Sequence, residues 1–415
     1  MGYINLKYKP SENDLVCLFR VEPNHISFSE VSEEIAAESS IGTWTDVKTM
    51  KPRVRKMEAK VFEMQGNWIK IAYPSELFEP GNMPQIMSSV AGNIFGMKSV
   101  KNLRLEDVKW PRKIMKSFKG PKFGIPGVRK ILKVKDRPLV GTIVKPKIGL
   151  SPKEHAKVAY QAWVGGCDIV KDDENLTSQS FNNFEKRIGE TLKMRDRAER
   201  ETGERKAYMP NVTAETKEMA RRARFVKRSG GRYVMVDIVT TGWAGLQTLR
   251  NEDLGLVIHA HRAGHAAFTR GKHGISMLVV ADIARLIGVD QIHIGTVVGK
   301  MVGMKEEVRH IEDEIEGGFV KAGKHTLEED WHGIKPVFAV CSGGLHPGLV
   351  PRLIKIMGKN IIIQAGGGIH GHPKGTKAGA TAMRQALEAS MKGIKLGEYA
   401  KDHKELKEAL KKWSK

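Results

Sequence analysis

Short apolar runs alternate with helical patterns over the second two-thirds of the chain. Eight apolar or β-branched runs follow Arg137, at 139–144, 168–170, 208–212, 233–239, 256–259, 291–298, 337–340 and 361–363. After the first run, Ser151 and Glu154 form a capping-box pattern around Pro152, which predicts a helix start. Eight strand–helix units predict an α/β fold, a (β/α)₈ TIM barrel. An open doubly wound sheet is the alternative, but polar residues follow nearly every run instead of one switch point.

The first third of the chain has a different pattern. Strand-like segments at 15–21, 54–63 and 68–72 are mixed with helical segments at 29–38 and 83–93. This order predicts a smaller α+β domain of the ferredoxin-like type. We therefore expect an N-terminal domain over 1–115, a catalytic barrel over 116–400 and a basic helical tail over 401–415. The tail carries Leu406, Leu410 and Trp413 on one stripe, so we expect it to dock on its own protein, with a membrane surface as the alternative.

The charge of the chain is unusual. It holds 69 Lys+Arg against 47 Asp+Glu, a net charge of +22, which points to a nucleic acid, an anionic membrane or an anionic substrate as partner. The alternative is a solvated, lysine-rich surface of the kind found in heat-adapted proteins. We find neither a known nucleic-acid module nor basic residues interleaved with aromatics, so no nucleic-acid partner is expected. Three widely spaced cysteines, an N-terminus without an apolar signal segment and the lack of a long apolar stretch predict a cytoplasmic protein without membrane contact.

In a barrel of this kind the active site lies where the strands end. The residues that end the predicted strands are Lys145, Lys147, Lys171, Asp173, Glu174, His261, Arg262, His265, His293, Lys300, Ser342, Gly343, Gly344, Gly366 and Gly367. Strand alternation puts Lys171 and Asp173 on one face. Carboxylates there suit a hard cation such as Mg²⁺, although an isolated KDDE segment is more often a solvated loop. The glycines suit a phosphate, or only tight turns, and the surrounding cations favour a doubly anionic ligand.

Several motifs together resemble one enzyme family. They are GTIVKPKIGL (141–150), GGCDIVKDDEN (165–175), HRAGH (261–265), HIGTVVGKM (293–301), SGGLH (342–346) and QAGGGIHGHP (364–373), with AAESSIGTWTDV (36–47) and AGNIFGMK (91–98) nearer the N-terminus. In this collinear order they resemble the large subunit of ribulose-bisphosphate carboxylase/oxygenase (RuBisCO), in its archaeal form III branch. The resemblance runs over nearly the whole chain.

The resemblance implies a role for each reactive residue. Lys171 would be carbamylated by an activator CO₂, would bind one Mg²⁺ with Asp173 and Glu174, and would take the C3 proton of the substrate. Lys145 would protonate the final carbanion, with Lys147 close to it. His261 would be a second acid/base group, and Lys300 would stabilise the incoming CO₂.

The resemblance also implies the substrate contacts. One phosphate would be bound by Gly344, Gly366, Gly367 and Lys300 with Thr43 and Trp44; the other by Arg262 and His293, with Ser342 and His265 nearby. Gly343 would also bind the substrate. Glu38, Thr43, Trp44 and Asn93 would come from a second subunit. The smallest active unit would then be a homodimer, which can assemble further into a ring of dimers.

The implied reaction is the Mg²⁺-dependent enolisation of ribulose 1,5-bisphosphate and the addition of CO₂ or O₂ to give 3-phosphoglycerate. Archaeal members are associated with nucleoside monophosphate (AMP) salvage. The alternative is a RuBisCO-like enolase or isomerase acting on a related phosphorylated sugar, but such paralogues usually lose several phosphate and loop-lysine positions that are present here. Val302 stands where many members have glutamate, and the short C-terminus departs from the plant pattern; both bear on how the loop after the sixth strand closes.

Overall fold

The computed structural model describes residues 2–43, 45, 47–299 and 305–413. Trp44, Lys300 and Val302 therefore lie outside the described residues. The chain divides into two compact units, one from 1–120, 264–287 and 317–334, the other from 121–263, 288–316 and 335–415. Each unit thus draws on segments far apart in sequence. The boundaries 1–115, 116–400 and 401–415 stay a prediction.

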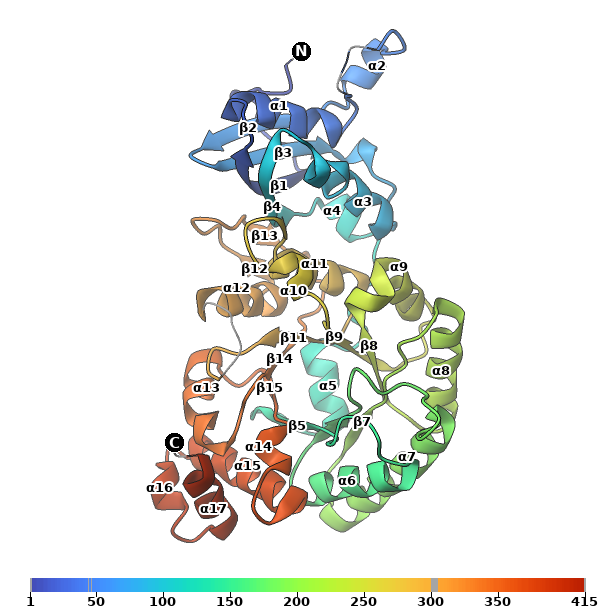
Figure 1. The fold of residues 1–415 in the computed structure, drawn as a ribbon, viewed down its shortest axis with the longest axis vertical. Coiled ribbons are helices and arrows are strands. Elements are labelled where there is room, and N and C mark those ends of the chain that lie inside the picture. The colour runs from blue at the N-terminus through green and yellow to red at the C-terminus, as the bar shows by residue number, and fades with distance from the viewer. Residues whose placement is uncertain (1, 44, 46, 300–304, 414–415) are drawn as a thin grey trace. The chain divides into compact units, whose positions relative to one another are not determined.

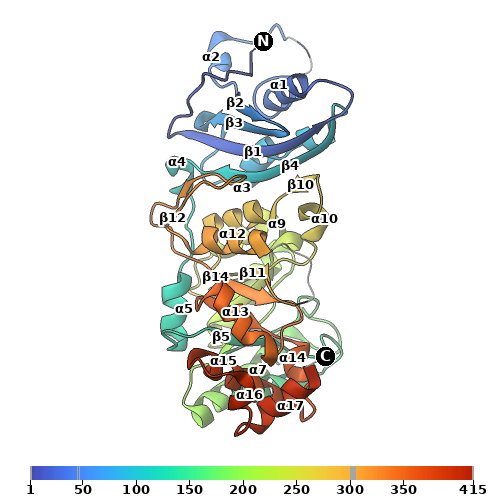
Figure 2. The same ribbon diagram turned by 90° about the vertical axis from the view of Figure 1, so that its left-hand side faces the viewer.

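The first unit is built on a five-stranded sheet. Its strands are β1 (Asp14–Pro23), β2 (Lys60–Gln65), β3 (Trp68–Pro74), β4 (Val100–Lys109) and β10 (Gly274–Ile275), in the order β10-β4-β1-β3-β2. Helix α1 (Phe28–Glu38) lies between β1 and β2 in sequence, and α3 (Met83–Val90) between β3 and β4. This β-α-β-β-α-β order confirms the predicted ferredoxin-like α+β domain. Figure 2 shows α1 against this sheet.

The smaller elements of the first unit complete it. They are the helices α2 (Pro52–Arg55), α4 (Arg112–Met115), α10 (Ala266–Thr269) and α11 (Met277–Ile287), the 3₁₀ helices η1 (Ser75–Leu77) and η2 (Asn93–Gly96), and a two-stranded hairpin of β12 (Phe319–Val320) and β13 (Glu329–Asp330). Leu327 in that hairpin packs on Val16 and Leu18 of β1. Since side chains alternate along a strand, Cys17 and Phe19 face the other side of the sheet.

Two elements of this sheet differ from the pattern-based prediction. The prediction of a strand over 54–63 was wrong for its first residues. Pro52 is the first residue of the short helix α2, and the strand begins only at Lys60. The ten-residue strand β4 was missed altogether. Its pairing with β1 shifts register, so that Leu18 faces Asp107 while Phe19 faces Leu105. The extra residue, Glu106, breaks the apolar alternation by which a strand is recognised.

The second unit is a closed parallel barrel. Its strands are β5 (Leu139–Ile143), β6 (Ile169–Lys171), β7 (Ala207–Met209), β8 (Tyr233–Asp237), β9 (Val257–His261), β11 (Gln291–Gly295), β14 (Phe338–Ser342) and β15 (Ile361–Gln364), in the order β7-β6-β5-β15-β14-β11-β9-β8. The ring closes between β7 and β8, where Met235 donates to the carbonyl of Pro210 (2.8 Å) and accepts from the amide of Val212 (3.0 Å). Closure confirms the barrel and excludes the open doubly wound sheet.

Helices surround these strands (Figure 1). They are α6 (Pro152–Val164), α7 (Phe184–Thr202), α8 (Thr216–Arg228), α9 (Ile238–Asn251), α12 (Lys305–Glu316), α13 (Val350–Met357) after the 3₁₀ helix η3 (Pro347–Leu349), α14 (Gly367–His370), α15 (Gly375–Met391), α16 (Leu396–Tyr399) and α17 (Lys404–Trp413). The predicted capping box of Ser151 and Glu154 starts α6, with Pro152 at its first position.

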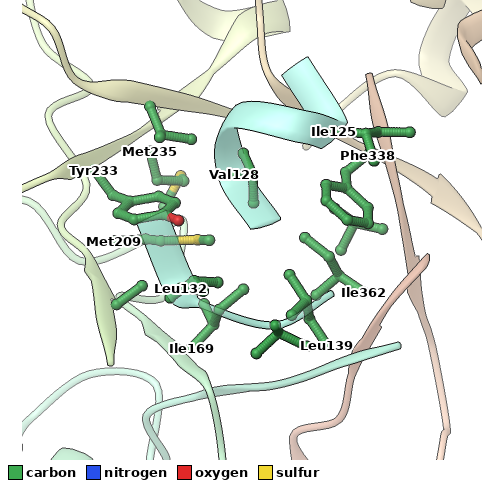
Figure 3. Packing of buried hydrophobic residues seen from close by; sticks show 14 residues of the cluster. Ile125, Val128, Leu132, Leu139, Ile169, Met209, Tyr233, Met235, Phe338 and Ile362 are labelled. Carbon is green, nitrogen blue, oxygen red and sulfur yellow. The ribbon is translucent and has the colours of Figure 1, made fainter. Parts of the chain in front are cut away.

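One helix closes the amino-terminal end of the barrel. The apolar residues Ile125, Val128 and Leu132 of α5 (Gly124–Leu132) pack on a ring of side chains from the strand starts (Figure 3), which includes Leu139, Ile169, Tyr233, Val257 and Phe338. These first residues point into the barrel, so every second residue after them also points inward. With this end filled, the carboxyl ends of the strands are left for chemistry.

The C-terminal tail docks on its own chain, as predicted. Leu406 and Ala409 of α17 are fully buried, and Gln385 of α15 accepts from the amide of Leu406 (3.0 Å). Among the described residues, no helix combines the length and the apolar character that crossing a bilayer demands.

The packing of α5 makes a testable prediction for stability. Leu132→Ala should lower the free energy of unfolding by about 2–5 kcal/mol, because it leaves a cavity in a filled core. The control is Leu6→Ala, at a leucine that is 62 % exposed, where the change should stay within about 0.5 kcal/mol. Denaturant unfolding of both variants measures the difference; equal effects would contradict the role of α5.

Candidate active site at the carboxyl ends of the barrel strands

Lys171 lies at the centre of the site. It is the last residue of β6, and its side chain is 1 % exposed. Its Nζ donates to the carbonyl of Asp172 (2.8 Å) and to Glu174 Oε2 (3.3 Å). Burial lowers the pKa of the Lys171 ammonium, although the carboxylates of Glu174 and Asp173 oppose the change. This amine therefore loses its proton more readily than a solvated lysine.

Two carboxylates lie beside this lysine. Asp173 Oδ2 accepts from Lys145 Nζ (2.7 Å), and Asp173 Oδ1 accepts from the side chain of Asn175 (3.0 Å). Burial alone would raise the pKa of Asp173, but the hydrogen bonds from Lys145 and Asn175 outweigh it and the pKa is lowered. Glu174 Oε2 lies 3.6 Å from His261 Nε2. The predicted residues Lys145, Lys171, Asp173, Glu174 and His261 are thus brought together.

Asp172 points to the opposite side and was not among the predicted site residues. It is fully buried and accepts from Tyr208 (2.7 Å), from Arg187 Nε (3.1 Å) and from the amide of Asn211 (3.0 Å). Burial would raise its pKa, but the Arg187 guanidinium and His155 hold the pKa well below its usual range. This network anchors the chain between Lys171 and Asp173, so that both face into the barrel. Asp172 lies within the KDDEN motif, but its partners come from other elements, so the motif did not indicate its role.

A second carboxylate that the prediction missed lies beside His261. Asp237, the last residue of β8, has its Oδ1 3.6 Å from His261 Nδ1 and accepts from the amide of Ala263 (2.8 Å). It therefore orients the loop that begins after β9. An aspartate at a strand end was the signal that could have indicated it.

The predicted residues His293 and Ser342 lie in one hydrogen-bonded group. His293 Nδ1 lies 2.9 Å from Ser342 Oγ, and His293 Nε2 lies 2.9 Å from Nε2 of His259. The rings of His261 and His293 meet edge to face at 4.8 Å. Burial, helped by Lys171, lowers the pKa of His259 to about 3, and burial with the neighbouring His261 lowers that of His293 well below 6.5. Both rings are therefore neutral at physiological pH.

The glycine-rich strand ends adopt backbone conformations or close contacts that favour glycine. Gly343 and Gly344 have φ of 115° and 72°, in the left-handed region that favours glycine. A side chain at Gly367 would meet no atom within 4 Å, and one at Gly366 would come within 3.4 Å of Lys145 Cε. The side chain of Arg262 lies next to Gly295: a Cβ added at Gly295 would be 3.0 Å from Arg262 Nη2. The glycines at the end of β15 thus lie beside Lys145.

Five other predicted residues are exposed or have a partner within their own unit. Lys147 is exposed just after β5. In the first unit, Asn93 donates to Glu38 Oε1 (3.4 Å), Thr43 is exposed, and His265 Nδ1 lies 2.8 Å from Thr269 Oγ1. The assignments of all predicted site residues stay predictions.

The donor set of the site fits a hard cation only in part. Within 2–43, 45, 47–299 and 305–413, no group of three or more His, Cys, Asp or Glu side chains is placed to hold a metal ion. Asp173 and Glu174 supply carboxylate oxygens, and Lys171 as an amine supplies none. A carbamate on Lys171 would add an oxygen donor, which is the kind that Mg²⁺ prefers.

Comparison with known proteins gives the family. The model of the ribulose bisphosphate carboxylase large chain catalytic domain matches residues 124–413, and that of its N-terminal domain matches residues 2–114. The chain belongs to the RuBisCO large-chain family. Ribulose bisphosphate carboxylase of Methanosarcina mazei is 55 % identical, over 100 % of this chain and 99 % of its own. That of Pyrococcus abyssi is 50 % identical, over 100 % and 96 %.

Solved RuBisCO structures agree with the fold. The octameric enzyme of Pyrococcus horikoshii, crystallised with sulfate, matches with a TM-score of 0.93 and 49 % identity over 100 % of this chain and 97 % of its own. The dimeric archaeal RuBisCO of Hyperthermus butylicus matches with 0.94 and 48 % over 99 % and 98 %. The predicted resemblance to archaeal RuBisCO is therefore confirmed. RuBisCO is generally magnesium-dependent.

The buried network of Asp172 makes a prediction for stability. Asp172→Asn should lower the free energy of unfolding by about 3–5 kcal/mol, because it leaves the Arg187 charge buried without its counter-ion. Asp196→Asn is the matched control, since Asp196 pairs with Arg195 (2.6 Å) but is 49 % exposed, and should cost at most about 1 kcal/mol. Denaturant unfolding compares the two; a small loss at Asp172 would show that the network is not a structural anchor.

Proposed function

We propose that this protein is a ribulose-bisphosphate carboxylase that converts ribulose 1,5-bisphosphate and CO₂ into two molecules of 3-phosphoglycerate. The observation that supports it most is the buried Lys171, whose Nζ lies among the carboxylates of Asp173 and Glu174 at the carboxyl ends of a RuBisCO-family barrel. The buried ammonium of Lys171 lies beside two carboxylates that could bind a hard cation. This arrangement supports a lysine that becomes an anionic carbamate in the active enzyme. O₂ would compete with CO₂ for the same enediolate.

The cofactor of this proposal is one Mg²⁺, bound by the carbamate of Lys171 with Asp173 and Glu174. The Lys171 ammonium would first lose a proton; its neutral Nζ would then bond to the carbon of activator CO₂ and release a second proton, so that the carbamate oxygens, which come from CO₂, carry the negative charge and can bind the metal. When bound, the metal would act as a Lewis acid on the substrate oxygens that gain negative charge. Asp173, which accepts from Lys145 in the described structure, would then exchange that lysine for the metal.

The chain's own groups move the protons. The carbamate of Lys171 would accept the C3 proton of the substrate, and His261 would exchange a proton at the C3 oxygen. His261 Nδ1 accepts from the amide of Ala263 (3.2 Å) and lies 3.6 Å from Asp237 Oδ1. Lys145, freed from Asp173, would donate the final proton to the carbanion of the second product, with Lys147 near it. Lys300 is proposed to stabilise the incoming CO₂.

The two phosphates would be bound at separate strand ends. Gly344, Gly366 and Gly367 would bind one with backbone amides, with Lys300, Thr43 and Trp44; Gly343 lies next to them. Arg262 would bind the other phosphate, and His293, Ser342 and His265 would lie close to it. Glu38, Thr43, Trp44 and Asn93 would be supplied by a second copy of the chain. We therefore propose a homodimer or a larger assembly of dimers. The buried free thiols of Cys17, Cys167 and Cys341 support a cytoplasmic location.

The activity has a direct test. After preincubation with Mg²⁺ and bicarbonate, the protein should incorporate label from ¹⁴C-bicarbonate into 3-phosphoglycerate when ribulose 1,5-bisphosphate is added. Consumption of the bisphosphate without incorporation of label would favour a RuBisCO-like enolase or isomerase instead. No consumption at all would reject both.

The carbamate has its own test. Lys171→Ala should abolish carboxylation, because the site loses both the base and a metal ligand. With ¹³CO₂ and Mg²⁺, a carbamate carbon signal should appear in the NMR spectrum of the wild type and be absent from the variant. Lys153→Ala, at an exposed lysine of α6, is the control and should keep both activity and signal. Carboxylation by Lys171→Ala at the wild-type rate would rule out the carbamate mechanism.

A further inference from the structure

Four side chains form a hydrogen-bonded chain inside the barrel. Gln291 Oε1 lies 3.0 Å from His259 Nδ1, His259 Nε2 lies 2.9 Å from His293 Nε2, and His293 Nδ1 lies 2.9 Å from Ser342 Oγ. The two rings are perpendicular, with centroids 4.8 Å apart. Gln291 and His259 are fully buried, and Ser342 is half-buried at the end of β14. This hydrogen-bonded series therefore runs from the barrel interior to Ser342, a predicted substrate-binding residue.

The direction of every hydrogen bond in this chain follows from its first member. A neutral imidazole has one N–H and one bare nitrogen. Because Gln291 Oε1 can only accept, His259 carries its proton on Nδ1 and has a bare Nε2. His293 must then donate from Nε2, which leaves its Nδ1 bare. That nitrogen can only accept, so the hydroxyl hydrogen of Ser342 points to His293.

We propose that Gln291 is a positioning residue that sets the tautomers of His259 and His293, and thereby makes Ser342 a hydrogen-bond acceptor for the substrate. With its hydrogen directed to His293, Ser342 Oγ has only lone pairs left for a ligand. It then accepts from a hydroxyl group of the sugar phosphate and does not donate to a phosphate oxygen. The identity of this ligand rests on the proposed carboxylase function, whereas the assignment of the two tautomers does not depend on that function.

The surroundings of Gln291 fit this role better than a packing role. Within the described structure its Nε2 is buried without a hydrogen-bond partner, and an unpaired buried donor costs about 1–3 kcal/mol. An apolar residue of similar volume would avoid that cost. Gln364 is the matched comparison: it is 1 % exposed in the same barrel, and neither its Oε1 nor its Nε2 has a described partner. Among the described residues, Gln364 is therefore not part of a hydrogen-bonded chain to the site.

The tautomers can be read directly by NMR. In full-length protein labelled with ¹⁵N-histidine, long-range ¹H–¹⁵N correlation distinguishes the two tautomers of each ring, and His259→Gln and His293→Gln assign the signals. We expect His259 protonated on Nδ1 and His293 on Nε2. Gln291→Met should replace each pattern by a mixture of tautomers, whereas Gln364→Met should leave both unchanged. The opposite tautomers in the wild type, or unchanged tautomers in Gln291→Met, would overturn the proposal.

Steady-state kinetics give the functional readout. Gln291→Met should raise KM for ribulose 1,5-bisphosphate about tenfold, the size of one misdirected hydrogen bond, while Gln364→Met should leave KM as in the wild type. Equal kinetics of the two variants would refute the role at Ser342. A wild type without carboxylase activity but with the expected tautomers would reject the proposed function and keep the positioning role of Gln291.

Discussion

The pairing of β7 with β8 is the contact on which the rest of the site depends. The amide of Met235 donates to the carbonyl of Pro210, and the carbonyl of Met235 accepts from the amide of Val212; these bonds close eight parallel strands into a ring. A closed ring has one interior, into which every second residue of each strand must point. Because α5 fills the amino-terminal end of that interior, the polar side chains gather at the carboxyl end. The site is thus a consequence of closure.

Because side chains alternate along a strand, the neighbouring residues Lys171 and Asp172 point to opposite sides, and their charges have different surroundings. Asp172 faces outward and is neutralised by Arg187, with Tyr208 and the amide of Asn211 as further donors. Lys171 faces inward, where burial destabilises its positive charge. The first arrangement is complete within this chain and serves as an anchor. The charge of Lys171 is balanced in part by Glu174 (3.3 Å), and the proposed carbamate would replace this buried positive charge by a negative one.

Much of this could be predicted from the sequence because the signals are local. The capping box at Ser151 starts α6 as expected, and the eight apolar runs became the eight barrel strands. Strand β4 was missed because the bulge at Glu106 disrupts its alternation. Asp172 and Asp237 were missed for another reason: their partners come from other strands and helices, and one sequence does not show which polar residues meet.

The sequence by itself determined the strand–helix order, the starts of helices and the set of reactive residues at the strand ends. These depend on backbone preferences and side-chain periodicity within a few residues. Only the tertiary structure decided which charges are neutralised and which way hydrogen bonds run. Desolvation and tautomers depend on atoms far apart in the chain, such as Gln291 and His259, or His293 and Ser342. Folding brings those atoms within 3 Å, and only then is their chemistry defined.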